Sequence, residues 1–215
     1  MMSVITAPGT EGFREFVLFI QNGIYLLDQK NELIKTTEQR EGGAHSGVDH
    51  EDTGEKGYNY RSERFLNRIT KHDIHKVFSS KFHGDPATPI FKTYTGERVI
   101  FRVIMPGDKP RNVGFTIHGH QWKAQPDDPF SRMISNQGAI SVGNVFNMEL
   151  DKGASQYPGD YLYRSGSLKW DIESGMWGIL RVQKVLKKSA YENYSNFEIE
   201  LDQEIKKEFK LKTIK

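Results

Sequence analysis

Short apolar runs separated by turn residues recur along the chain from Phe13 to Val182. Within residues 98–105, apolar side chains at every second position would fall on one face of an extended backbone. Similar runs predict strands at 16–20, 24–27, 90–95, 113–122, 140–150 and 177–182, with turns rich in glycine, proline or asparagine between them. The first two runs form either a hairpin or one strand with a kink. Residues 66–84 differ, because their pattern favours a short helix. The pattern therefore predicts a chain built mainly from β-strands.

Three less regular segments accompany these strands. Residues 1–12 contain a proline and two glycines and are expected to form a loose lead-in. Residues 28–57 are polar and glycine-rich, which predicts a long surface loop or an ordered insertion. Residues 183–215 form a charged C-terminal extension in which Phe197, Ile199 and Leu201 alternate with charged or polar residues. This alternation suits an exposed strand that adds to a neighbouring sheet, or a tail that packs on its own domain.

Two groups of histidines lie in these irregular regions. His72 and His75 are three residues apart and share a helical face with Ile69, which favours a half-buried helix over a metal site. The second group lies in the predicted loop and comprises His45, Asp49, His50, Glu51 and Asp52. These side chains could bind a cation through imidazole nitrogens and carboxylate oxygens. The alternative is an ordinary solvated loop.

Composition narrows the classes of function. With 30 basic and 28 acidic residues, the chain has no excess charge to attract nucleic acid or an anionic membrane. No apolar run reaches the ~18 residues of a membrane-spanning helix, and the N-terminal residues lack the features of a signal peptide. We therefore expect a cytoplasmic protein or a piece or subunit of an exported one. The absence of cysteine excludes disulfides, thiolate nucleophiles and any blue-copper site formed by this chain alone.

Two segments carry motifs. Residues 113–122 are VGFTIHGHQW, and residues 159–182 are GDYLYRSGSLKWDIESGMWGILRV. They resemble the cupredoxin domains of multicopper oxidases, where the corresponding motifs are His-x-x-His-x-His-Gly-His and His-Cys-His-Ile-x-x-His-x-x-x-Gly-Met. The large multi-domain bacterial type, which includes manganese oxidases, is the most similar. The resemblance covers residues 13–182 and implies an all-β, cupredoxin-like Greek-key sandwich with an insertion at 28–84 and an extension at 183–215.

The resemblance also identifies the positions of the copper ligands, and most of them are replaced. In the first motif the four histidine positions are Val113, Thr116, His118 and His120, of which the last is generally not a ligand in the family. In the second motif the His-Cys-His positions, the next histidine and the axial methionine are Ser165, Gly166, Ser167, Asp171 and Met176. The blue-copper site is therefore lost, and His118 and His120 remain as candidate metal ligands.

His118 and His120 are two residues apart on a predicted strand. Because side chains at i and i+2 point to the same face, both imidazoles could meet one copper or zinc ion. The alternative is that packing of the strand retains these residues without a metal. Ser165 and Ser167 lie near Asp171 in sequence, but without a placed histidine they form no catalytic triad.

The resemblance implies a structural or assembly component of a copper-dependent oxidoreductase, with catalysis supplied by its partners. Those partners would be other cupredoxin domains or further copies of this chain, in a secreted, periplasmic or cell-surface protein. One alternative is a copper or zinc protein that uses His118 and His120. Another is a binding module that uses its loops, with a pocket lined by Trp122, Trp170 and Trp177.

Overall fold

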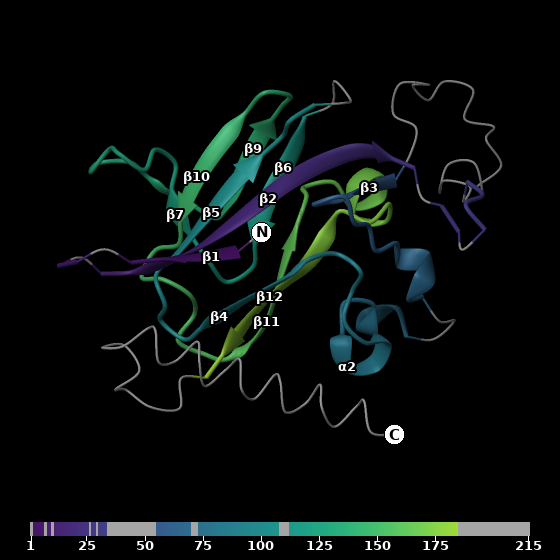
Figure 1. The fold of residues 1–215 in the computed structure, drawn as a ribbon, viewed down its shortest axis with the longest axis horizontal. Helices are drawn as coiled ribbons and strands as arrows, with labels where there is room; N and C mark the ends of the chain where they lie inside the picture. Colours follow the sequence, from purple (N-terminus) through teal and green to yellow (C-terminus); the bar gives the residue numbers. More distant parts are fainter. Residues whose placement is uncertain are drawn as a thin grey trace. The chain divides into compact units, whose positions relative to one another are not determined.

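The computed structural model describes residues 2–184 except positions 7, 10, 26, 29, 34–54, 70–72 and 108–111, and it describes only the backbone of Lys169 and Trp170. The described residues form two five-stranded sheets and one small two-stranded sheet (Figure 1). The first sheet has the order β1-β2-β5-β10, with β3 also paired to β2, and the second has the order β4-β12-β11-β6-β9. The predicted all-β sandwich is therefore confirmed.

The strands of the first sheet are β1 Met2–Ile5, β2 Phe13–Ile24, β3 Glu55–Tyr58, β5 Val99–Ile104 and β10 Val145–Glu149. Those of the second are β4 Ile90–Tyr94, β6 Val113–Ile117, β9 Asn136–Ile140, β11 Gly159–Arg164 and β12 Trp177–Gln183. A small hairpin adds β7 Trp122–Lys123 and β8 Met133–Ile134.

The order of the strands in space is that of a sandwich with crossovers between its sheets. The chain passes from β4 in the second sheet to β5 in the first, and back to β6. It crosses again from β9 to β10 and from β10 to β11. The β2–β5 and β4–β12 pairs are parallel and the other sheet pairings are antiparallel, so neighbours in a sheet are often distant in sequence. These crossovers are the Greek-key element of the prediction.

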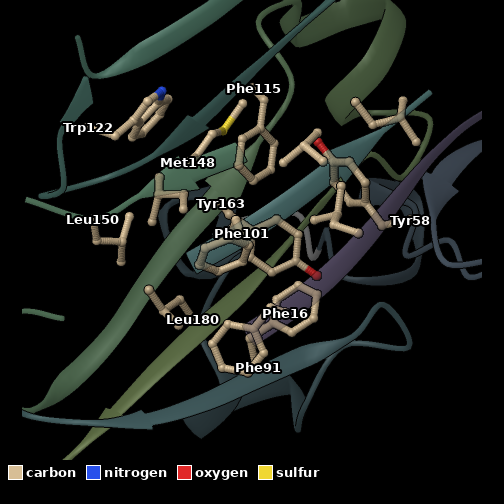
Figure 2. Close-up of a cluster of buried hydrophobic side chains, with 14 of the residues drawn as sticks. Phe16, Tyr58, Phe91, Phe101, Phe115, Trp122, Met148, Leu150, Tyr163 and Leu180 are labelled. Atoms are coloured by element: carbon tan, nitrogen blue, oxygen red, sulfur yellow. The ribbon is translucent and has the colours of Figure 1, made fainter. Parts of the chain in front are cut away.

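The main core lies between the inward faces of the two sheets. Alternate residues of β2 and β5 contribute one side, and β6, β11 and β12 contribute the other. Aromatic rings meet at its centre, where Phe91 lies 5.3 Å from both Phe101 and Tyr163, measured between ring centroids (Figure 2). Tyr163 is fully buried, and its hydroxyl donates a hydrogen bond to the Pro89 carbonyl, which satisfies the polar end of the ring.

A second apolar cluster covers part of the outer face of the second sheet. The segment from Phe65 to His83 forms three short helical pieces, η2 Phe65–Asn67, η3 Ile74–Lys76 and α2 Ser80–His83. Phe65, Val77 and Phe78 pack on Trp177 and Ile179 of the sheet, and Arg68 donates hydrogen bonds to the carbonyls of Val77 and Gly84. The arginine thereby ties the helical pieces together.

Several local expectations were wrong. Met2–Ile5, in the predicted lead-in, pairs with β2 as a strand, and Glu55–Tyr58, in the predicted loop, forms β3. Residues 13–24 form one strand with an irregular register at Gln21–Ile24, which is the kinked alternative to a hairpin. Residues 66–84 do not form one helix. Among the described residues, no helix is long and apolar enough to cross a bilayer.

Parts of the predictions fall outside the described residues. They include most of the predicted loop at 28–57, with His45, Asp49, His50, Glu51 and Asp52, and also His72. The charged extension lies beyond the described residues from position 185 onward.

Candidate functional site

The first motif leaves its strand earlier than the sequence predicted. In β6 the side chains of Val113, Phe115 and Ile117 are buried in the main core, and Thr116 points to the opposite, outer face. The strand ends at Ile117, and Gly119 adopts a φ of +74° beside the Tyr161 ring. A left-handed turn at Gly119 therefore separates His118 from His120. Glycine adopts this conformation readily because it has no Cβ atom. The expectation that both imidazoles share one strand face is wrong.

His120 forms a hydrogen bond that anchors the loop containing Ser155. Its side chain is buried, and the Ser155 backbone N–H donates to Nε2 at 3.1 Å. Because Nε2 accepts, the ring proton lies on Nδ1 and is donated to the His118 carbonyl at 3.0 Å. Tyr161 packs edge-on against the imidazole and donates its hydroxyl to the Tyr157 carbonyl. Both ring nitrogens are thus occupied by hydrogen bonds within the protein.

This arrangement predicts a pH-dependent loss of stability. Burial lowers the pKa of His120 below its usual value, although the hydrogen bond to the His118 carbonyl opposes the shift. Because the unfolded chain then binds the proton more tightly, the contribution of His120 is full above about pH 6.5 and declines as pH falls toward the folded pKa. We expect the urea midpoint to be lower at pH 5 than at pH 7, and the difference to shrink in His120→Gln.

The control for this measurement is His75→Gln, which removes an exposed imidazole from the helical segment. It should leave the dependence of the urea midpoint on pH close to that of the parent. An equal dependence in the parent and in His120→Gln would show that the buried imidazole does not bind its proton more weakly in the folded chain.

His118 has a different environment and lies at the surface. Its Nε2 accepts a hydrogen bond from Nε of Arg164 at 2.8 Å. Partial burial, and then the charge of Arg164, lower the pKa of His118. Because Nε2 accepts this hydrogen bond, it carries no proton. The lone pair that could bind a metal is therefore directed at a guanidinium.

The second motif brings Ser165, Asp171 and Met176 together through hydrogen bonds. Ser165 is fully buried and donates its hydroxyl to Oδ2 of Asp171 at 2.5 Å. The Ser165 N–H donates to the Met176 carbonyl, and the Met176 N–H donates to the Asp171 carbonyl. Gly166 lies against Gly114, the neighbour of Val113. The replaced ligand positions therefore form one hydrogen-bonded and packed unit.

A π-helix, η4 Leu168–Ile172, occupies the loop between these positions. Its turn begins at Ser167, whose carbonyl accepts from the Ile172 N–H. Single-turn π-helices are rare and are enriched at functional positions. Here the π-helix directs Asp171 inward, where the carboxylate is buried against Ser165.

Gly175 ends this segment where another part of the chain crosses it closely. Gly175 has a φ of +113°, and a Cβ at this position would clash with the Ser62 hydroxyl. The Lys56 N–H and the Ser62 hydroxyl both donate to the Ser174 carbonyl, so β3 and the following turn are fastened to the hairpin. The Gly-Met pair of the motif is thus explained by packing: Gly175 permits the approach, and Met176 is fully buried in the main core.

The residues at the replaced positions do not fit copper. A blue-copper site needs two imidazoles and a thiolate, but Val113 is a core residue, Gly166 has no side chain, and Asp171 is bonded to Ser165. Thr116 accepts from Asn136 and donates to the Ser135 carbonyl, so its hydroxyl is also engaged. Across the part of the chain that the structure describes, no group of three or more His, Cys, Asp and Glu side chains could hold a metal ion.

The predicted tryptophan pocket is also not formed as expected. Trp122 belongs to the main core between the sheets, and Trp177 belongs to the outer cluster under the helical segment. These two side chains are therefore fully buried in different clusters and cannot line one pocket. Sequence reasoning missed Arg164, Ser155 and Tyr161, which contact the two histidines, because each of these partners comes from a distant part of the chain.

Comparison with known proteins finds similar solved structures but no matching family model and no matching curated protein. A copper nitrite reductase from Nitrosomonas europaea is similar with a TM-score of 0.45 and 13% identity, over 81% of this chain and 42% of that chain. A multicopper oxidase is similar with a TM-score of 0.45 and 16% identity, over 79% of this chain and 44% of that chain. This chain thus spans less than half the length of either protein.

Proposed function

We propose that this chain is a cupredoxin-type domain without a copper site of its own, which acts as a structural component of a larger copper-dependent oxidoreductase. Its partners would be other cupredoxin-type domains, or further copies of this chain, that carry the metal. Catalysis would belong to those partners. The resemblance of the two motifs to multicopper oxidases also suggests that such an assembly is exported.

The proposal rests on one observation: the residues at the family's copper-ligand positions take part in hydrogen bonds or core packing within the protein. Ser165 and Asp171 form a buried hydrogen bond, while Val113 and Met176 are side chains of the main core. Both nitrogens of His120 have partners within the protein. A site awaiting a metal would keep its lone pairs available, whereas these groups contribute to the stability of the fold.

The helical segment supports a role in assembly. Its inward side chains cover Trp177 and Ile179, as described above. Other large apolar side chains of the same segment are more than half exposed, namely Leu66 at 51%, Ile74 at 64% and Phe82 at 57%. Large apolar side chains on both sides of one layer are expected of an element that lies between two domains.

Copper loading tests the proposal. The whole chain is incubated with excess Cu²⁺ or, in parallel, Zn²⁺, then passed through a desalting column and subjected to elemental analysis. We expect background metal in the parent and in the double variant His118→Ala/His120→Ala, because the histidine lone pairs are already engaged. Stoichiometric metal in the parent that is lost in the double variant would refute the proposal. It would instead establish the metal protein that uses His118 and His120.

A further inference from the structure

The outer face of the second sheet has an apolar half and a polar half. Arg164 of β11 lies directly opposite Trp177 of β12 on one side and Thr116 of β6 on the other, and Thr116 lies opposite Asn136 of β9. Directly opposed residues of antiparallel strands project from the same face. Trp177 is covered by the helical segment, whereas Arg164 and Thr116 are partly exposed and Asn136 is exposed. The row of opposed residues from Trp177 through Arg164 and Thr116 to Asn136 is therefore apolar and covered at Trp177, and polar and accessible from Arg164 onward.

The guanidinium of Arg164 is held in place on this surface by two acceptors. Nε donates to Nε2 of His118 and Nη1 donates to the Ser165 carbonyl, each at 2.8 Å. Neither acceptor is a carboxylate: one is a backbone carbonyl and the other is an imidazole nitrogen that accepts the hydrogen bond and so carries no proton. The orientation of the side chain is therefore fixed without its charge being balanced.

Six other described arginines have a carboxylate partner. Each of the following makes an ion pair with a carboxylate at 2.7–3.0 Å: Arg14, Arg64, Arg68, Arg98, Arg102 and Arg181. Arg164 makes no such ion pair within the described ranges, and its Nη2 has no hydrogen-bond partner there. Asp171, bonded to the adjacent Ser165, is buried beneath this surface. Within the described residues, no carboxylate is therefore paired with the charge of Arg164.

The described neighbours of Arg164 on β6 and β9 carry no charge and little bulk. Thr116 and Asn136 are neutral and bonded to each other at 2.6 Å between Oγ1 and Nδ2. Gly114 and Gly166 lie against each other beside this row, with no side chain to cover the surface. On the side of β6 and β9, an anion can therefore approach the guanidinium without displacing a described carboxylate or a large described side chain.

We propose that Arg164, held by His118, is a binding site for an oxyanion, either a carboxylate or a phosphate. A guanidinium binds these groups through two parallel N–H donors, and a fixed guanidinium loses less conformational freedom on binding than a free one. Because the site is partly exposed and rests on one charge, we expect a Kd on the order of millimolar. His118 is a positioning residue here, since it holds the arginine and does not touch the ligand.

NMR titration of the whole ¹⁵N-labelled chain tests this site. Sodium acetate or sodium phosphate is added at constant pH and at an ionic strength held constant with sodium chloride, and the Nε–Hε signal of Arg164 is followed. We expect a saturable shift with at least one of the two anions. The anion that binds more tightly identifies a carboxylate or a phosphate as the natural group.

Variants separate binding from unspecific charge effects. Arg164→Gln should abolish the saturable response, read from backbone amides of residues 116–118 and 164–166, while Arg164→Lys should weaken binding several-fold. Arg132→Gln removes an exposed arginine elsewhere and should leave binding unchanged. Unchanged core amide signals in each variant would exclude unfolding as the cause. A response that chloride reproduces, or that persists in Arg164→Gln, would overturn the proposal.

Discussion

Glu97→Ala is expected to destabilise the protein by about 3–5 kcal/mol, the range for removing one partner of a buried ion pair. Both Glu97 oxygens accept from Nε of Arg14, at 3.0 and 2.9 Å, and the two side chains are almost completely buried. Oε2 also accepts from the Thr93 hydroxyl at 2.6 Å and from the Tyr94 N–H at 3.0 Å. Removal of the carboxylate would leave a buried guanidinium without its counter-charge, together with unpaired polar groups.

Glu97 connects the two sheets, so its removal would also weaken the contact between them. Arg14 belongs to β2 of the first sheet, while Thr93 and Tyr94 belong to β4 of the second. The carboxylate therefore fastens the two layers where the chain turns from β4 to β5. The measurement is urea unfolding at pH 7, with Glu149→Ala as the control.

Glu149 pairs with Arg98 at 2.7 Å, but both side chains are more than a third exposed. Exposed pairs contribute only about 0–1 kcal/mol, so this control should change the urea midpoint little. Equal effects of the two substitutions would contradict the role assigned to Glu97.

Trp177→Ala is expected to cost about 3–5 kcal/mol, the range for truncation of a buried tryptophan. Its ring is fully buried under the helical segment, 4.8 Å from Phe78 between centroids and 5.1 Å from the Arg68 guanidinium. Its Nε1 also donates to the Glu63 carbonyl at 2.6 Å. The substitution would open a cavity between the sheet and the segment that covers it.

Trp177→Phe serves as the matched variant. It keeps much of the apolar contact and loses the hydrogen bond to Glu63, for which about 1 kcal/mol is expected. Urea unfolding compares the two variants, and limited proteolysis around residues 65–84 reports whether the cover opens locally. If Trp177→Ala were no less stable than Trp177→Phe, the helical segment would not depend on this ring.

The strand pattern and the loss of copper ligands were both accessible from the sequence. Alternating apolar residues in 98–105 and 177–182 predicted strands, and these are β5 and β12. The pattern is local, since burial of one sheet face requires apolar residues at every second position. The absence of cysteine excluded a blue-copper thiolate before any geometry was known.

The environments of His118 and His120 could not be predicted from the local sequence. The motif predicted a strand through residues 113–122, yet β6 ends at Ile117 because the chain makes a left-handed turn at Gly119. His120 then finds its partner 35 residues away at Ser155, and His118 finds its partner 46 residues away at Arg164. Two residues that are neighbours in sequence are thereby given unrelated environments.

Local sequence therefore determined that this chain forms strands, where most of them lie, and that it lacks a copper thiolate, because side-chain alternation and residue identity are properties of short segments. The tertiary structure decided how the polar groups are used. Only the crossing of distant strands places Arg14 against Glu97, 83 residues apart, and leaves Arg164 facing outward with a neutral acceptor. The role of a buried polar side chain depends on its hydrogen-bond partner. In a sandwich with crossovers between its sheets, that partner is usually remote in sequence.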